Sequence, residues 1–225
     1  MSTWDVVAST GDDQVRRHAY RHGDLHRALV EAGLQMARGG GPDAVVLREA
    51  TRRVGVSPNA AYRHFTDHRA LLEAVCAGAQ AALADAIETE LSAAQTGVSD
   101  RAAEARAGLR AVGTAYVAFA QTEPGLFRTA FSVPVDLATA ASPAKAGSRG
   151  RTPFQLLAAA LDILVEAGVL PPQRRRGAEA LAWSAVHGLA VLAIDGPLRE
   201  FDRAQIDSLT QRLVDMVEYG LYAPS

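Results

Sequence analysis

The chain contains one cysteine, Cys76, and one lysine, Lys145, among its 225 residues. A single cysteine excludes an intramolecular disulfide and is typical of a protein that works in a reducing cytoplasm. Arginine replaces lysine even where no anion contact is expected, so we attribute the scarcity of lysine to coding bias. Residues 1–20 lack the apolar stretch of a signal peptide, and the apolar stretch 178–194 is too short and too polar to span a bilayer. We therefore expect a soluble, cytoplasmic protein.

Sequence signatures of catalysis are also missing. The chain has no G-x-S-x-G motif, no H-E-x-x-H motif and no phosphate-binding loop. Ser184 lies three residues before His187, but no carboxylate is evident to orient the histidine. His18, His22 and His26 are four residues apart, but they extend from an N-terminal arm expected to be flexible rather than from a metal site. We expect neither an enzyme nor a bound metal or cofactor.

The net charge of −2 is unevenly distributed. Residues 14–70 hold ten arginines against five acidic residues, which leaves +5. Residues 71–225 hold 13 basic and 17 acidic residues, which leaves −4. A small basic head on an acidic body is typical of a nucleic-acid-binding domain attached to another unit, although a solvated charged surface would give the same count.

Apolar residues recur with helical spacing along the chain, and no segment alternates with the period of a β-strand. We predict an all-α fold without internal repeats, with a disordered arm at 1–20, a three-helix head at 21–72 and a helical-bundle body at 73–225. The stretch 132–151 is rich in Ala, Ser, Pro and Gly, so we expect a loop that is either a lid or simply disordered. The predicted helices cover about 24–38, 47–54, a short segment from 58, 67–93, 100–122, 152–167, 174–194 and 202–221.

The pattern that says most about function lies at 47–65. A short amphipathic helix is followed by Gly55, which can adopt the left-handed conformation that ends a helix tightly. Ser57 is a good N-cap for a second helix, and Pro58 suits its first position. Two helices joined by so short a turn cross steeply, which is the helix-turn-helix geometry that places a recognition helix in the DNA major groove. The head is therefore expected to bind double-stranded DNA.

The predicted helix 174–194 is apolar nearly all round. Such a helix is buried on both sides, which in a bundle means one face on its own core and the other on a partner. The helix 202–221 repeats an apolar stripe. We expect these two helices to form an isologous homodimer interface.

Three stretches in fixed order resemble a known family. They are Leu47–Leu72, with Gly55-Val56-Ser57 and Tyr62-Arg63-His64-Phe65; the aromatic stretch Tyr116–Phe131; and Trp183-Ser-Ala-Val-His187-Gly188. Together they resemble a TetR-family transcriptional regulator with a Trp-His-Gly type of C-terminal ligand-binding domain. The resemblance implies a homodimer whose head binds DNA, and a helical body that binds a small molecule and then releases the DNA.

The resemblance also assigns residues to DNA. Tyr62 and His64 would hold phosphates, which positions the recognition helix without reading sequence. Asn59 suits an adenine edge and Arg48 suits guanine. Tyr62 has an alternative role as a core aromatic residue beside Phe65, and the two roles are compatible. The residues that would face DNA are Arg48, Ser57, Asn59, Tyr62, Arg63, which is ambiguous between groove and backbone, His64 and His68.

Two positions depart from the family pattern. Val46 stands where the family usually has Ser or Thr to cap the second helix. His68 stands where it usually has a lysine that offers a permanent charge to a phosphate. A histidine changes its charge near pH ~6.5, so this backbone contact is in doubt.

Trp183 and His187 are four residues apart and share a helical face. They are either a core tryptophan with a satisfied histidine, or part of an effector pocket for a small, mainly apolar or aromatic molecule. The pocket candidates are Tyr116, Phe119, Phe127, Phe131, Phe154, Trp183 and His187. We predict a repressor that a small effector releases from a palindromic operator. The alternative is a ligand-insensitive, architectural DNA-binding protein whose body serves only for dimerisation.

Overall fold

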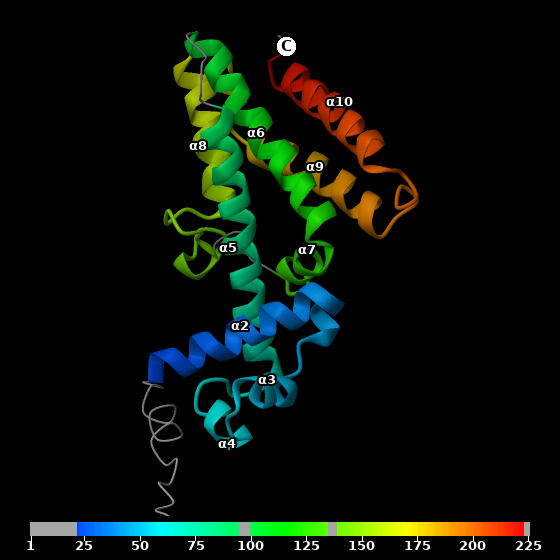
Figure 1. Cartoon of the computed structure of the whole chain (residues 1–225). Coiled ribbons are helices and arrows are strands. Elements are labelled where there is room, and N and C mark those ends of the chain that lie inside the picture. Colours follow the sequence, from blue (N-terminus) through cyan, green and yellow to red (C-terminus); the bar gives the residue numbers. More distant parts are fainter. Residues whose placement is uncertain (1–21, 95–99, 135–138, 223–225) are drawn as a thin grey trace, which may run out of the picture.

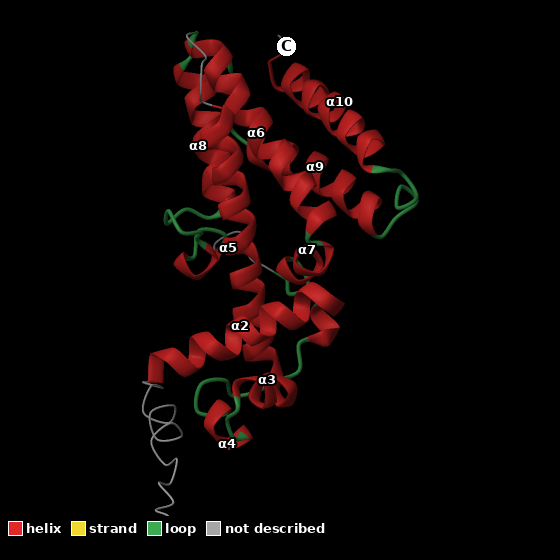
Figure 2. Cartoon of the chain, in the orientation of Figure 1, coloured by secondary structure: helices red, strands yellow, loops and turns green. Residues whose placement is uncertain are grey.

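The computed structural model describes residues 22–94, 100–134 and 139–222 of the chain. In these ranges the protein is helical and has no strand, as predicted (Figure 2). The predicted arm at 1–20 lies outside the described residues, so that prediction stays open. The helices are α2 (His22–Gly40), α3 (Leu47–Val54), α4 (Pro58–Ala61), α5 (His68–Ala94), α6 (Arg101–Thr122), α7 (Pro124–Ala130), α8 (Pro153–Glu166), α9 (Ala178–Ile194) and α10 (Arg203–Tyr222), with the 3-10 turns η1 (Pro42–Ala44), η3 (Pro143–Lys145) and η4 (Pro172–Arg174).

The head consists of α2, α3, α4 and the beginning of α5 (Figure 1). Its core is apolar and buried, because the helices turn their apolar faces inward. Leu29, Val45, Ala50 and Leu71 are 0% exposed. Burying several such side chains is the main stabilising contribution that a head of three short helices can have.

The long helix α5 connects head and body. Its 27 residues span about 40 Å. By length and composition alone, α5 is long and apolar enough to cross a membrane. The sequence-based search for membrane spans considered only 178–194 and missed this helix. In the protein α5 instead contacts α2, α6, α7 and α8, the packing of a core helix. The predicted boundary at 72/73 falls inside this continuous helix.

A second connection between head and body is α7. Its Gly125 lies so close to the carbonyl oxygens of Ala37 and Arg38 at the end of α2 that an added Cβ would collide with both. Arg38 and Glu123 form an ion pair across the same junction, with Nε to Oε2 at 3.4 Å. A change in the body that moves α7 therefore acts directly on α2.

Within one chain, the helix α9, predicted to contribute to a dimer interface, buries a different line of residues from the one its periodicity indicates. The side of α9 that is buried within the protein is the line Ala178, Ala182, Val186 and Ala190. Helical spacing predicts one face with Ala178, Leu181, Ala185, Leu189 and Leu192 and an opposite face with Trp183, His187, Val191 and Ile194. Of these residues only Ala178 belongs to the buried line. Three of these four buried residues are alanine, and α9 packs against α6. Trp183, Leu189 and Ile194 are partly buried against the core, whereas Leu181, Val191 and Leu192 are exposed.

Candidate functional site

The turn between α3 and α4 has the geometry that the sequence predicted. Gly55 has φ 77° and ψ 31°, and its N–H donates to the carbonyl of Thr51 at 2.9 Å. The Ser57 hydroxyl accepts a hydrogen bond from the N–H of Ala60 at 3.4 Å, and Pro58 begins α4. The left-handed glycine reverses the chain within a few residues, so α4 projects from the head (Figure 1).

The helix α4 is only one turn long and ends at Ala61. Tyr62 is its C-cap, and Arg63 and His64 lie in the turn that follows. The predicted DNA-facing residues are therefore spread over a short helix and a turn rather than along one helix. Ser57, Asn59, Tyr62 and Arg63 are exposed and His64 is half-buried.

The role of Tyr62 as a core aromatic residue is wrong. Its side chain is 56% exposed, whereas Phe65 is 3% exposed and fills the core. The ring of His26 stacks on Phe65, with centroids 4.7 Å apart, and meets the ring of His64 edge-on at 6.3 Å. Phe65 thus anchors the turn and leaves Tyr62 on the outer surface of the head.

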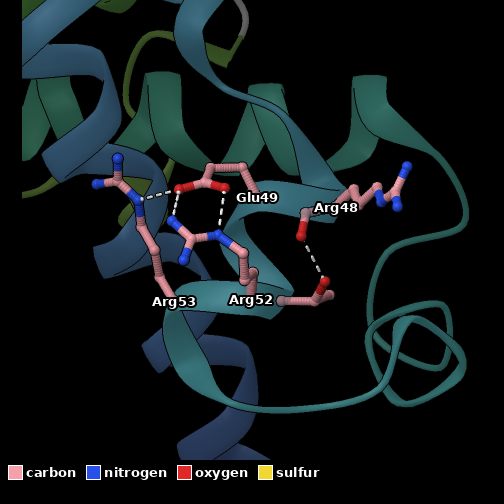
Figure 3. Close-up of polar contacts among 5 residues, drawn as sticks. Arg48, Glu49, Arg52 and Arg53 are labelled. Carbon is pink, nitrogen blue, oxygen red and sulfur yellow. Dashed lines mark hydrogen bonds and ion pairs between the residues drawn. The ribbon is translucent and has the colours of Figure 1, made fainter.

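The surface of α3 contains a charge cluster that the sequence analysis missed. Glu49 accepts hydrogen bonds from Nε and Nη2 of Arg52, both at 2.8 Å, and from Nε of Arg53 at 2.9 Å (Figure 3). These hydrogen bonds lower the pKa of Glu49 to about 2. The signal was available, because acids and bases spaced i,i+3 and i,i+4 meet on a helix.

Arg48 lies outside this cluster. It is exposed at the beginning of α3, and its guanidinium points away from Glu49 (Figure 3). Its carbonyl oxygen accepts a hydrogen bond from the Thr51 hydroxyl at 2.7 Å. Of the three arginines of α3, Arg52 and Arg53 bond to Glu49 and Arg48 does not.

The two departures from the family pattern have structural consequences. Val46 is the N-cap of α3 and provides no side-chain hydrogen bond, as its sequence implied. His68 donates from Nε2 to the carbonyl of Val45 at 2.6 Å. In a neutral ring with hydrogen on Nε2, Nδ1 can only accept, so it cannot bond to a phosphate oxygen. A phosphate contact by His68 requires the protonated ring.

The body encloses a cavity of about 80 Å³ between α5, α6, α8, α9 and α10. Four of the seven pocket candidates line it: Tyr116, Phe131, Phe154 and Trp183. Phe119 and Phe127 are buried but do not line the cavity. His187 does not line it either, but its ring contacts three residues that do: Tyr116, Phe131 and Trp183. Residues that the sequence did not single out also line it, among them Gln80, Gly113, Val214 and Val217.

A hydrogen-bonded trio joins α6 to α9 beside the cavity. The Tyr116 hydroxyl accepts from Nε1 of Trp183 at 3.0 Å and lies 2.8 Å from Nδ1 of His187. Burial raises the pKa of Tyr116 and lowers the pKa of His187. Both groups are therefore held neutral near pH ~7. His187 has the hydrogen-bond partner that the satisfied-histidine alternative requires, and Trp183 lines the cavity, whereas effector binding stays a prediction.

The described part of the loop 132–151 packs against α5. Its Lys145 is buried, the N–H of Ser148 donates to Asp85 at 2.6 Å, and Ala140 lines the cavity. Residues 135–138 lie outside the described ranges. The described part thus forms one wall of the cavity.

Among the described residues, no three or more His, Cys, Asp or Glu side chains are grouped to hold a metal ion. His18 and the side chain of His22 are not described.

A helix-turn-helix head with exposed polar residues, joined by one helix to a body with an apolar cavity, defines a class of DNA-binding regulators. Residues 29–75 match the family described as bacterial regulatory proteins, tetR family, and residues 109–217 match the tetracyclin repressor-like C-terminal domain. The chain belongs to the TetR family of transcriptional regulators, which are DNA-binding proteins and not enzymes.

Solved structures agree on the fold. A protein of unknown function from Rhodococcus sp. RHA1 is 27% identical, with a TM-score of 0.67 over 91% of this chain and 99% of that chain. A TetR variant from Acinetobacter baumannii AYE in complex with minocycline is 18% identical, with a TM-score of 0.50 over 85% and 93% of the two chains. A TetR transcriptional regulator from Rhodococcus sp. RHA1 is 16% identical, with a TM-score of 0.50 over 87% and 95%. No curated protein sequence matches the chain.

Proposed function

We propose that the protein is a homodimeric repressor that acts in the cytoplasm, binds a palindromic operator, and is released by a small, mainly apolar effector. One observation carries this proposal. The helix α5 begins in the DNA-binding head at His68 and forms the cavity wall with Gln80 and Ile87. A ligand that changes the position of α5 changes the position of the head.

The exposed residues of the head support DNA binding. Tyr62 at the C-terminal end of α4 and Arg63 in the turn after it are exposed, so they can hold phosphates. Asn59 can read adenine, and Arg48 can read guanine with two hydrogen bonds. Ser57, His64 and protonated His68 complete the proposed contact set. Because Glu49 neutralises part of the arginine charge of α3, less of that charge is available for sequence-independent contacts with phosphates.

An exposed apolar surface supports dimerisation through α9 and α10. Leu181 is 67% exposed and Leu192 is 43% exposed on α9, and Met216 is 62% exposed on α10. Large apolar side chains exposed on two helices that pack together are typical of an interaction site. A second copy of the chain is the proposed occupant, because a palindrome requires two heads related by a two-fold axis.

The cavity supports a small effector without charge. Tyr116, Trp183 and Gln80 already bond to protein partners, and the rest of the lining is apolar. A volume of about 80 Å³ is roughly half that of a ~150 Å³ cavity known to bind benzene. An aromatic effector therefore has to widen the cavity. We also propose, from the sequence resemblance, that Trp183, His187 and Gly188 belong to a body of the Trp-His-Gly type.

The widening can be transmitted to the DNA-binding head. Phe131 lines the cavity immediately after α7, and Gln80 donates from Nε2 to the carbonyl of Ala130 at 2.7 Å. At its other end, α7 touches α2 through Gly125. A ligand affects DNA binding only if it binds more tightly when the two heads of the proposed dimer are at a separation that does not fit the operator. The coupling free energy between two such sites is typically about 1–3 kcal/mol.

The experiment has two stages. Operator duplexes are first selected from random DNA with the full-length protein, and the selected sequence is expected to be a palindrome. Small aromatic and aliphatic molecules are then tested by thermal shift, and those that stabilise the protein are tested for operator release by fluorescence anisotropy. At least one stabilising molecule is expected to release the operator.

A cavity-filling variant gives the matched control. Ala182 lines the cavity, so Ala182→Leu is expected to abolish release while operator affinity is retained. Ala103 is exposed at the beginning of α6, and Ala103→Leu should respond to the effector as the wild type does. If every stabilising molecule leaves operator affinity unchanged, the body serves only for dimerisation, which is the architectural alternative.

A further inference from the structure

A second cavity lies at the end of α5 that is remote from the head. Its volume is about 200 Å³, and α5, α6, α8 and the loop before α8 form its walls. It shares no lining residue with the effector cavity. Unlike that cavity, it is lined by charged as well as apolar side chains, so its ligand has different chemistry.

Glu88 of α5 lines this second cavity and is only 3% exposed. Neither of its carboxylate oxygens has a hydrogen-bond partner. The nearest positive charge is Nε of Arg151, an ion-pair partner at 3.4 Å whose side chain is 47% exposed. A buried carboxylate without hydrogen bonds is costly, because water has been removed from it and no donor has replaced the water. This group is therefore suited to bind a cation that carries several N–H donors.

Arginine side chains on the wall of the same cavity are suited to bind a negatively charged group. Arg149 donates from Nη1 to the Ser92 hydroxyl at 3.0 Å, and Ser92 lies one helical turn, about 6 Å, beyond Glu88 on α5. Its remaining N–H groups can bind a carboxylate. Arg101 lines the same cavity and is 70% exposed. The cavity thus has a carboxylate at a buried position and guanidinium groups nearer solvent.

We propose that this cavity binds a small zwitterion that carries a primary ammonium group and a carboxylate at opposite ends of a short chain. The ammonium group donates to Glu88, and the carboxylate accepts from Arg149. Leu91, Leu156 and Ile163 line the same cavity and can contact the methylene groups of the ligand. This site is separate from the proposed effector cavity and does not depend on operator release.

The probe is 4-aminobutanoate, titrated into the full-length protein by calorimetry. n-Butylamine and butanoate, each with one of the two charges, are the matched ligands. The zwitterion is expected to bind at least about tenfold more tightly than either, because each charge-assisted contact contributes about that factor.

Two variants assign the ends of the ligand. Glu88→Gln is expected to abolish binding of 4-aminobutanoate, and Glu90→Gln, the same change at an exposed position of α5, is expected to retain it. Arg149→Gln is expected to reduce the affinity for 4-aminobutanoate to that for n-butylamine. Because Arg149 is exposed, this variant tests the proposal even if Glu88→Gln fails to fold.

Three results would overturn the proposal: no heat of binding with the wild-type protein, equal affinity for the zwitterion and for n-butylamine, or unchanged binding by Glu88→Gln. None of these measurements involves DNA. A negative result in any of them would therefore leave the proposed repressor function unaffected.

Discussion

The Tyr116 hydroxyl donates its hydrogen to Nδ1 of His187 at 2.8 Å. Trp183 Nε1–H can only donate and uses the hydroxyl as an acceptor at 3.0 Å. Because Tyr116 is buried, its own hydroxyl hydrogen also needs an acceptor, and Nδ1 of His187 is the acceptor within reach. His187 therefore has its own hydrogen on Nε2. This relationship fixes α9 against α6 next to the body cavity and supplies the first prediction.

Tyr116→Phe should destabilise the protein by about 1–3 kcal/mol, because it leaves the Trp183 N–H and His187 Nδ1 without their partner. Chemical denaturation followed by circular dichroism measures the change. Tyr222→Phe is the matched control: the Tyr222 hydroxyl is buried without a hydrogen-bond partner, so its removal should be neutral or stabilising. Equal losses in both variants would contradict the assigned hydrogen bonds.

Protonation of His187 should destabilise the folded protein in mild acid. Burial lowers its pKa from the ordinary value of 6.5, so below pH 6.5 the unfolded chain takes up a proton that the folded protein does not. The contribution to stability is present above pH 6.5 and is lost as the pH falls below it. The free energy of unfolding should therefore fall less steeply in His187→Gln than in the wild type between about pH 7 and about pH 5. Parallel pH profiles would show that His187 titrates normally.

Tyr62→Ala should weaken binding to all DNA sequences by a similar factor, because its proposed partner is a phosphate, and should leave the salt dependence of binding nearly unchanged, because the tyrosine hydroxyl carries no charge. As Tyr62 is 56% exposed, its removal should change stability by less than about 0.5 kcal/mol. Tyr62→Phe, which lacks only the hydroxyl, separates hydrogen bonding from ring contact. Arg48→Ala should instead relax the preference at one base pair. Unchanged operator affinity for Tyr62→Ala would mean that the wrong segment has been placed in the groove.

Glu49→Gln should increase non-specific DNA affinity several-fold and steepen its salt dependence, because it frees Arg52 and Arg53 for phosphate contacts. Anisotropy measured over a series of salt concentrations on a non-operator duplex tests this. Acid alone should not have the same effect near neutrality, because the pKa of Glu49 is about 2. Glu31→Gln is the control, since Glu31 is exposed on α2 and bonds to Gln35 rather than to an arginine.

Leu181→Glu and Met216→Glu should convert the dimer to a monomer and abolish palindrome binding, while helical content stays the same. Both side chains are more than 60% exposed, at 67% and 62%, so a charge there does not disturb the core of the subunit. Leu189 on α9 and Leu213 on α10 are unsuitable for this test, because both pack partly against that core. Glutamate at Leu189 or Leu213 would unfold the subunit as well as disrupt an interface, so the loss of dimer would have two causes. Sedimentation velocity that shows an unchanged dimer for both exposed variants would place the interface elsewhere.

Several features could be predicted from the sequence because their causes are local. Gly55, Ser57 and Pro58 determine where two short helices meet, and their conformations depend on neighbouring residues alone. The same holds for Thr152, whose capping box with Gln155 begins α8. These signals are sufficient for the all-α fold and for the DNA-binding class.

The tertiary structure decided which faces are covered and which polar groups are satisfied. Periodicity showed that α9 is apolar all round, but only packing placed Ala182 inside and Leu181 outside. Glu88 looks in the sequence like any solvated helical acid, and it is buried because α5 meets α6 and α8 there. Helix boundaries depend on contacts within about four residues, whereas burial depends on segments far apart in the chain. The sequence thus determined the class of protein, and the tertiary structure decided its cavities.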